Sequence, residues 1–394
     1  MYSFQKEFIL IPHSPLIHFQ YDSSGAALRA TEVKPKLDRY LISHRGGEIP
    51  LEWRNEKSKD ALNYQLRIIS LENNPPIELG RGTNYDIFYG NMGDGPKKKG
   101  IKNKQKLVVT CFIKELLDYI EKVIGDFFIV TNFGTMQSKG FGSFTVDGKD
   151  STPDHICDVL KKEYTHNGHC YKFKSNERFA FKNIKTIYSL IKSGLNYTDG
   201  SEVITEEDAD SDITVPYKRS ILFDYMRENG IGNEKAWMKQ NNISPKLGRE
   251  KNQVDKRSMY VRALLGISEK IEYLKEKPVR GIRPQKEIVS IKEKPEGKDD
   301  KEKKENQIER LNSPILFKVI NDTVYFVGRT PNDCIYGKTF LFSSGLGKGS
   351  LLVPRKDELP DDFMNEFMHY AYQKLKKCKK KPKFNLDYVS IEEV

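Results

Sequence analysis

Alternating apolar and polar positions in the first 150 residues predict a small unit that mixes strands with helices. Tyr64–Leu71 alternates between the two kinds of residue, as a half-buried strand does. Ala27–Ile42 has the composition of a helix, and Pro35 predicts either a start or a kink within it. The apolar residues of Leu107–Ile124 fall on one helical stripe, and Gly125 supplies a stop signal.

Three further segments read as strands. Phe8–Phe19 is apolar but carries two prolines, which suits an irregular or edge strand. Phe127–Thr131 and Phe141–Val146 are short apolar runs on either side of a glycine-bearing loop. The predicted order is therefore strand, helix, one or more strands, helix, strand. This order is that of a ferredoxin-like α+β sandwich, an architecture that RNA-recognition modules also use.

The second half shows a similar mixture. Apolar periodicity predicts a hairpin in which Asn321 and Asp322 join two strands. Helices are expected at Asn183–Ser193, Ile221–Asn229, Lys235–Gln240, Met259–Leu274 and Asp361–Leu375, and strands at Ile315–Ile320, Thr323–Val327 and Thr339–Ser343. We therefore predict an α+β protein with two ferredoxin-like, RRM-like domains, residues 1–150 and 151–394, the second with helical and charged insertions.

Composition narrows the class of protein. The chain has 394 residues, of which 37% are hydrophobic, so a packed core is expected. It contains no apolar run of about 18 residues, the length that spans a bilayer, and Met1–Leu10 lacks the features of a signal peptide. Five cysteines without a CxxC pair do not make a disulfide scaffold. A cytoplasmic protein with no membrane partner is the expectation.

The net charge of +11 is unevenly distributed. Pro96–Lys106 carries six lysines and Lys374–Lys383 seven, while Asp199–Asp212 carries seven acidic residues. Ile291–Glu309 is almost wholly charged but of mixed sign, which indicates a solvated linker or surface loop. The lysine runs permit a polyanionic partner, but they suit an ordinary solvated surface equally well.

The most specific indication of a binding function is a set of glycines next to a lysine. Asn132–Phe144 reads NFGTMQSKGFGSF and places Gly134, Gly140 and Gly142 around Lys139. Glycine lets the backbone approach a phosphate closely and expose its N–H groups, while lysine adds charge. The GK[ST] ending of a Walker A loop is absent. The segment is either a phosphate-binding loop, with Phe141 available to stack on a base, or a plain hairpin.

A second segment, Gly25–Ile42, together with this loop indicates a resemblance to a known protein family. In Gly25–Ile42, Thr31, Val33 and Lys34 lead into the first predicted helix, with Arg29 before them and Arg39 after them. This pattern resembles an anchor of the CRISPR-associated RAMP superfamily, and Lys139–Gly142 is similar to the basic-GxG ending of that family's glycine-rich loop. Ala30 and Pro35 stand where many members have glycine.

The late stretch Arg310–Ile320 (RLNSPILFKVI) is similar to one found in type III members. The chain thus resembles RNA-binding subunits of type III-B (Cmr) effector complexes. The resemblance implies a role in antiviral defence, with CRISPR RNA, other complex subunits and target RNA as partners. It also implies a non-catalytic position near the 3′ end of the guide. The RNA-binding residues would be Arg29, Lys34, Arg39, Gly134, Lys139, Gly140, Phe141 and Gly142.

An endoribonuclease is the alternative function. Some RAMP subunits cleave target RNA through an aspartate in the loop after the first strand, and Asp22 stands in such a loop, beside His18. A carboxylate there could hold a divalent metal that assists cleavage. A histidine, with His13, His18 and His44 as candidates, could instead act as general base in processing precursor guide RNA. The competing interpretation of Asp22 is a turn residue that caps the YDSSG loop.

Potential zinc ligands form a further cluster with the spacing H-x-C-x8-H-x2-H-C: His155, Cys157, His166, His169 and Cys170. Two imidazoles and two thiolates can supply a tetrahedral site. The spacing fits no standard zinc finger, and the alternative is a set of surface histidines with two ordinary cysteines. Zinc is the one cofactor that the sequence suggests.

Overall fold

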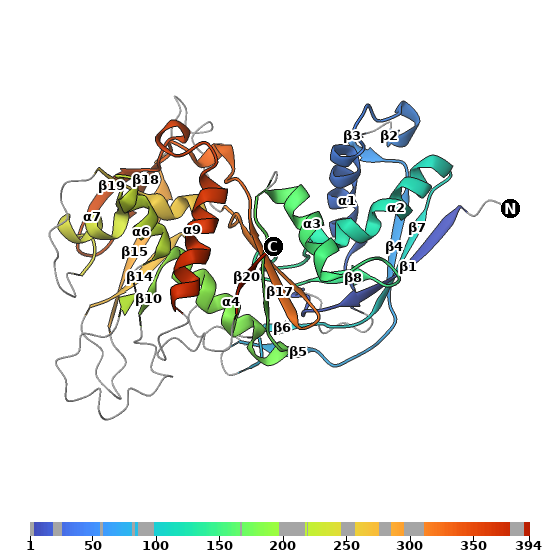
Figure 1. Ribbon diagram of the computed structural model, residues 1–394, viewed down its shortest axis with the longest axis horizontal. Coiled ribbons are helices and arrows are strands. Elements are labelled where there is room, and N and C mark those ends of the chain that lie inside the picture. Colours follow the sequence, from blue (N-terminus) through green and yellow to red (C-terminus); the bar gives the residue numbers. More distant parts are fainter. Residues whose placement is uncertain are drawn as a thin grey trace.

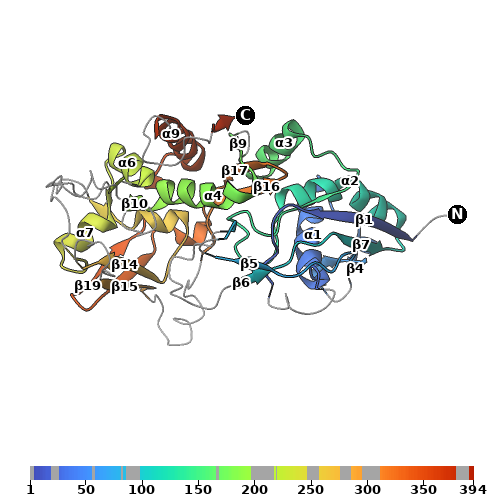
Figure 2. The same cartoon turned by 90° about the horizontal axis from the view of Figure 1, so that it is seen from below.

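The computed structural model of the chain describes residues 4–18, 26–55, 58–80, 83–85, 98–165, 168–196, 217–218, 220–245, 257–275, 285–294, 311–378 and 390–394. The molecule is elongated, with the N-terminal elements at one end of its long axis (Figures 1 and 2). The acidic segment Asp199–Asp212 lies outside the described residues, as does 295–309 of the predicted linker Ile291–Glu309. The prediction was wrong for its start, because Ile291 and Glu293 are buried at the end of a strand, β15 (Lys286–Glu293). Within the described parts, no helix has the length and apolar character needed to cross a bilayer.

The first half forms a ferredoxin-like unit. Its antiparallel sheet has the strand order β4-β7-β1-β8, and the chain runs through it as strand, helix, two strands, helix, strand. Its elements are β1 (Gln5–Pro12), α1 (Ala30–His44), β4 (Gln65–Ser70), β7 (Gln105–Thr110), α2 (Lys114–Val130) and β8 (Phe144–Val146). The expected fold class is confirmed in this half, and Pro35 lies inside a continuous α1.

The prediction of a helix at Leu107–Ile124 was wrong at both ends. Leu107 and Val109 belong to β7 and pair with Phe8 and Lys6 of β1, so this segment extends the sheet. The helix α2 then passes through Gly125 to Val130, and the predicted strand Phe127–Thr131 is its last turn. Gly125 does not end the helix, because it keeps helical backbone and its missing side chain makes room for Lys149.

The second half repeats the same topology. Its antiparallel sheet has the order β16-β17-β9-β20, again with one helix after the first strand and one before the last. The elements are β9 (Tyr171–Lys174), α4 (Glu177–Lys192), β16 (Ile315–Ile320), β17 (Thr323–Gly328), α9 (Phe363–Cys378) and β20 (Glu392–Glu393). The predicted β16–β17 hairpin is confirmed, with Asn321 at a φ of 53° in its turn.

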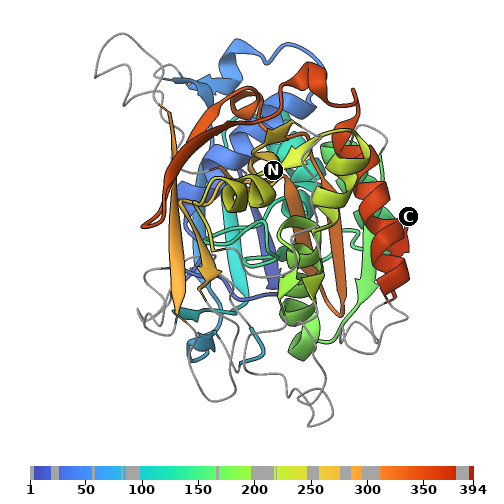
Figure 3. The same ribbon diagram turned by 90° about the vertical axis from the view of Figure 1, so that its left-hand side faces the viewer.

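Two insertions in this second unit build a third sheet with the order β14-β15-β18-β19. Strands β14 (Lys270–Leu274) and β15 (Lys286–Glu293) precede the β16–β17 hairpin, whereas β18 (Thr339–Ser343) and β19 (Lys348–Leu352) follow it. In Figure 3 this inserted sheet lies on one side of the molecule and α9 on the other. The predicted helix at Met259–Leu274 was wrong, because Gly266 at a φ of 100° separates a short 3-10 helix from β14.

The remaining elements are short. They are η1 (Leu51–Trp53), β2 (Arg54–Asn55), β3 (Ser58–Leu62), β5 (Ile77–Leu79), β6 (Lys98–Gly100), α3 (Pro153–Tyr164), β10 (Leu195–Asn196), β11 (Tyr217–Lys218), α6 (Ile221–Glu228), β12 (Gly232–Asn233), α7 (Glu234–Gln240), β13 (Ser258–Met259), η2 (Val261–Leu265), η3 (Asp333–Ile335) and η4 (Lys356–Glu358). The predicted helices at Ile221–Asn229 and Lys235–Gln240 are therefore confirmed as α6 and α7.

The two ferredoxin-like units meet along β16, the edge strand of the second sheet. The N–H of Phe317 donates to the carbonyl of Ser138 at 3.0 Å, and Ser143 Oγ donates to the carbonyl of Val319 at 2.6 Å. Asn132 Nδ2 donates to the carbonyl of Phe317 at 2.9 Å. The loop before β8 thus satisfies backbone groups that an edge strand would otherwise leave unpaired.

Lys318, between these two positions on β16, is completely buried. Its Nζ donates to the carbonyls of Phe128 at 2.6 Å and Thr131 at 2.9 Å, and to Asn132 Oδ1 at 3.1 Å. These oxygens lie at the end of α2, where helix carbonyls lack partners within the helix and the helix dipole favours a cation. Lys318 therefore closes the end of a helix in the other unit.

We predict that Lys318→Met lowers the free energy of unfolding by about 1–3 kcal/mol, the cost of leaving buried acceptors unpaired. Methionine has a similar length but no donor. Urea denaturation of the purified chain measures the change. The matched control is Lys172→Met, a half-buried lysine on β9 of the same sheet, which should change stability by less than about 0.5 kcal/mol. Equal stability of Lys318→Met and the wild type would show that these hydrogen bonds do not hold the units together.

Candidate nucleic-acid interface

The glycine-rich loop between α2 and β8 requires its glycines. Gly134, Gly140 and Gly142 have φ values of 73°, 85° and 66°, in the left-handed region that side chains disfavour. A Cβ on Gly142 would lie 1.9 Å from the carbonyl oxygen of Phe133, and one on Gly134 would lie 2.7 Å from that of Ile17. The glycine spacing that stands out in the sequence thus has a structural cause.

The loop and helix α1 are in direct contact, although about a hundred residues separate them in the chain. Glu32 Oε1 accepts a hydrogen bond from the N–H of Gly134 at 2.8 Å. Lys36 Nζ donates to Glu32 Oε1 at 3.1 Å, to Gln137 Oε1 at 3.0 Å and to the carbonyl of Asn132 at 3.1 Å. The structure therefore brings the two segments of the family resemblance together in one place.

This contact is an anion-binding arrangement occupied by a side chain of the protein itself. A backbone N–H at a left-handed glycine and a lysine ammonium converge on one carboxylate oxygen of Glu32. Burial lowers the pKa of Lys36, and the nearby Glu32 opposes that shift. Arg29 and Arg39 share this helix face by their spacing, so these four side chains together have a net charge of 3 − 1 = +2. A phosphate would meet the same donors and an excess of positive charge.

Sequence reasoning missed Lys36. Arg29, Glu32, Lys36 and Arg39 recur at intervals of three and four residues, which is the spacing of one helix face. That spacing could have identified Lys36 as a member of the cluster. Arg39 is exposed, and its Nε donates to the carbonyl of Pro35, so its guanidinium remains at the surface.

Lys34, the lysine that the resemblance singled out, contacts other parts of the protein. Its Nζ lies 2.8 Å from Asp38 Oδ2, donates to the carbonyl of Leu62 at 2.9 Å and lies 4.0 Å from the centre of the Tyr64 ring. The side chain of Asp38 is only 4% exposed. Lys34 thus neutralises a buried carboxylate, and Lys36 takes its place in the basic cluster.

The second part of the loop faces the other ferredoxin-like unit. Phe141 is completely buried, with its ring 4.3 Å from that of Phe181, and has no surface with which to stack on a base. Lys139 Nζ lies 5.4 Å from the ring centre of Tyr188 on α4, and burial lowers the pKa of this lysine to about 8. Gly140 packs against Val319. These residues form part of the joint between the units.

The residues proposed for catalysis are only partly within the described chain. His18 is 8% exposed, and burial together with the nearby Arg29 lowers its pKa, so the imidazole is neutral at pH 7. Asp22 lies outside the described residues. His13 accepts a hydrogen bond from the N–H of Asn321 at 3.1 Å and lies 2.8 Å from Thr145 Oγ1. Burial lowers the pKa of His13 to about 3, which suits a neutral structural histidine.

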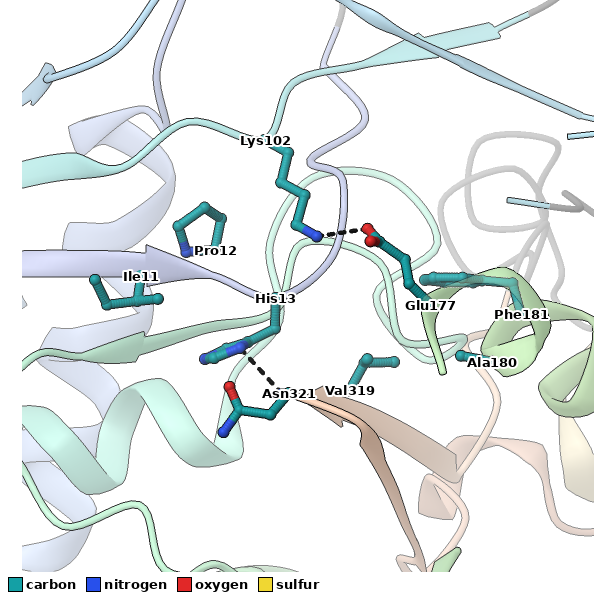
Figure 4. A pocket seen from close by; sticks show the side chains of 9 residues that line it. All are labelled: Ile11, Pro12, His13, Lys102, Glu177, Ala180, Phe181, Val319 and Asn321. Atoms are coloured by element: carbon teal, nitrogen blue, oxygen red, sulfur yellow. Dashed lines mark hydrogen bonds and ion pairs between the residues drawn. The ribbon is translucent and has the colours of Figure 1, made fainter. Parts of the chain in front are cut away.

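A cavity of about 240 Å³ lies beside His13, between the end of β1, the start of α4 and the β16–β17 turn. Figure 4 shows an ion pair between Lys102 and Glu177 across it, with Nζ and Oε1 2.5 Å apart. Glu177 also accepts a hydrogen bond from Tyr85. Because Lys102 and Glu177 pair with each other, we interpret the cavity as part of the contact between the two units.

Among the described residues, Cys157 and Cys170 lie close to each other, but no three of the predicted zinc ligands form a group. His155 pairs with Asp126 at 2.9 Å, while Cys157 and Cys170 are buried. His169 Nδ1 lies 3.0 Å from Glu393 Oε1, and His166 falls outside the described part of the chain. Of the five, only His169 belongs to a group of three candidate ligands in the regions that the structure describes.

Two ferredoxin-like units in one chain, joined through a glycine-rich loop, define a protein of the RAMP class. Residues 3–195 match the family model of the Cmr1 N-terminal domain, and residues 217–391 match that of the Cmr1 C-terminal domain. The chain therefore belongs to the Cmr1 family, whose members are subunits of type III-B CRISPR (Cmr) effector complexes. No curated protein matches the sequence. The N-terminal family model includes β9 and α4, which by topology belong to the second ferredoxin-like unit.

We predict that Gly142→Ala destabilises the chain more than Gly148→Ala does. Both glycines have positive φ, at 66° and 73°, so both substitutions incur the strain of a left-handed side chain, about 1–2 kcal/mol. A Cβ on Gly148 meets nothing within 4 Å, whereas one on Gly142 clashes with Phe133, which adds about 1–3 kcal/mol. Urea unfolding of the two variants measures the difference. Equal losses would contradict the close approach of the loop backbone.

Proposed function

We propose that this chain binds CRISPR RNA in a Cmr effector complex, near the 3′ end of the guide, and that it does so without cleaving RNA. The observation that carries the proposal is the contact of α1 with the glycine-rich loop, where Lys36 and the N–H of Gly134 share one carboxylate oxygen of Glu32. Arg29 and Arg39 lie on the same helix face by their spacing. Other subunits of the complex and the paired target RNA are the expected neighbours. The same proposal includes a domain division at residue 150, just after β8 ends at Val146.

The chemistry of the cluster favours a phosphate of the RNA backbone. A phosphate oxygen carries the charge and the lone pairs that Glu32 Oε1 presents to Gly134 and Lys36. Guides differ in sequence, so a subunit that serves all of them must contact the phosphates and sugars common to every guide. Two arginines on the same helix face add positive charge, which would attract the phosphates along the RNA strand and not its bases. Base stacking on Phe141 is not part of the proposal, because that ring is buried.

The contacts of Glu32 and His18 support a role without catalysis. Glu32, the carboxylate that reaches the loop, is neutralised by Lys36 and hydrogen-bonded to Gly134, which makes it a weak ligand for a second cation. His18 is almost fully buried, so its imidazole is poorly placed to take a proton from a ribose hydroxyl. The alternative, a ribonuclease that uses Asp22, draws no support from the described residues.

We predict that Arg39→Glu weakens the binding of guide RNA for every spacer sequence alike. Losing one phosphate contact should reduce the slope of log K against log salt by about 1. The double variant Arg29→Glu/Arg39→Glu should reduce it further. Conversely, Glu32→Gln removes a competing charge and should tighten binding about fivefold, which corresponds to about 1 kcal/mol between unit charges near 4 Å in water. Fluorescence anisotropy with labelled guide RNA over a salt series measures all three.

Lys270→Glu is the matched control, because this exposed lysine lies on β14 at the opposite end of the molecule from α1 (Figures 1 and 2). It makes the same change in net charge and should leave the affinity within about twofold. If Lys270→Glu weakens binding as much as Arg39→Glu, the attraction is a general effect of charge and α1 is not the interface. A spacer-dependent effect of Arg39→Glu would also contradict backbone recognition.

Absence of cleavage is tested separately. We predict that the chain, alone or in the reconstituted complex, leaves labelled guide RNA intact with Mg²⁺ or with chelator. We also expect Asp22→Ala to leave target cleavage by the complex unchanged, with His18→Gln as the matched variant for a histidine-dependent reaction. Denaturing gels of end-labelled RNA measure both reactions. Cleavage that disappears with Asp22→Ala would make the chain a metal-dependent ribonuclease, and loss with His18→Gln would make it a guide-processing one.

A further inference from the structure

A cluster of two histidines and one glutamate lies on the second ferredoxin-like unit. His169 lies two residues before β9, His369 lies on α9 and Glu393 lies on β20. Strand β20 pairs with β9 over two residues only, Glu392 with Lys172 and Glu393 with Tyr171. Figure 2 shows α9, β9 and the C-terminal end of the chain at the same side of the molecule. Three separate segments thus contribute one potential ligand each.

The ligand atoms already converge. Glu393 Oε1 lies 3.0 Å from His169 Nδ1 and 2.8 Å from His369 Nδ1, and the two ring centres are 5.3 Å apart. All three ligand atoms lie within 4.8 Å of one another. In a tetrahedral zinc site with bonds of about 2.0–2.1 Å, neighbouring ligand atoms are roughly 3.3 Å apart. Small side-chain rotations therefore suffice to place a metal ion between them.

We propose that His169, His369 and Glu393 form a site for one divalent transition-metal ion, with Zn²⁺ the ion that suits this set of ligands. Two imidazoles and a carboxylate are hard to borderline donors that zinc accepts in three of its four positions. The side chains of His169 and His369 are 43% and 45% exposed, so water can reach the fourth position. Only His169 is shared with the zinc site expected from sequence.

The surroundings of the cluster contain groups that orient metal ligands. Gln373 Nε2, one turn further along α9, lies 3.4 Å from His369 Nε2. A metal at Nδ1 would leave a proton on Nε2, and the Gln373 amide, turned over, would present Oε1 to accept it. The buried side chain of Tyr171 lies beside Glu393, its pairing partner in the sheet. The Tyr171 hydroxyl can donate a hydrogen bond to this carboxylate and so orient it.

A metal here would act structurally. The two-residue pairing of β20 with β9 is a short connection for the last strand of a sheet. One ion bound by His169, His369 and Glu393 would fasten β20 both to the start of β9 and to α9. This inference is independent of RNA binding, because it concerns the opposite unit of the chain from α1.

Zinc binding to the full chain tests the proposal. The protein is prepared without a histidine tag, stripped of metal and titrated with Zn²⁺ in competition with a chromophoric chelator. We expect one ion per chain, and about tenfold or greater weakening in His369→Gln and in Glu393→Gln, which keeps the size of the side chain. Zinc should also raise the melting temperature of the wild type and not that of the variants. Circular dichroism of each variant verifies that it is folded.

His155→Gln is the matched control, since this histidine pairs with Asp126 outside the cluster. It should bind zinc as the wild type does. Co²⁺ provides a second readout, because its visible absorption in a site of low coordination number should appear in the wild type and disappear in His369→Gln. The proposal is overturned if the wild type binds no zinc, if His155→Gln weakens binding as much as His369→Gln, or if binding survives in the His169→Gln/His369→Gln double variant.

Discussion

The architecture depends on the hydrogen bonds of one buried side chain, the terminal amino group of Lys318. It sits on the edge strand of the second sheet and closes the carboxyl end of a helix that belongs to the first unit. Burial lowers the pKa of this lysine far below its ordinary value, so its charge is unfavourable in that environment. The hydrogen bonds to three oxygens offset that cost, and they exist only when the two units are correctly placed. Lys318 therefore makes the relative position of the units specific, whereas apolar contacts alone would permit sliding.

The same joint governs the glycine-rich loop. One end of the loop carries Gly134, which meets α1 and its basic cluster, and the other end carries Lys139 and Gly140, which pack on the second unit. A loop held at both ends presents its N–H groups with little loss of entropy when an anion binds. A displacement of the second unit would move the loop and hence the proposed RNA contact. The loop is thus both a structural connection and the candidate binding element.

Much of the fold follows from local sequence, and the exceptions have identifiable causes. The β16–β17 hairpin and helices α4, α6 and α9 were predicted because their periodicity and turn residues agree. The segment from Leu107 to Thr110 was assigned to a helix, since a short apolar run fits either period, and only its pairing with β1 decides in favour of a strand.

For the candidate site, the sequence predicted the two segments that form it but not the contacts of their side chains. Its two segments are recognisable in sequence, but the direction in which each side chain points is not. Lys34 and Lys36 differ by two positions and therefore lie on different faces of α1, one against Asp38 and the other against the loop. Likewise, glycine spacing cannot show that Phe141 is buried, because Phe181, its partner, comes from a different element. Tertiary partners decide these roles.

The inserted sheet has a consequence for how the second half folds. Along the chain, β14 and β15 come before the β16–β17 hairpin and β18 and β19 come after it, yet β15 and β18 are neighbours in one sheet. The β16–β17 hairpin therefore lies in a stretch of chain whose two ends, β15 and β18, are paired in the inserted sheet. Forming the hairpin brings β15 and β18 together and lowers the entropy of closing that stretch into a loop. The two sheets should consequently form and melt as a single cooperative unit, since their buried apolar residues also belong to one cluster.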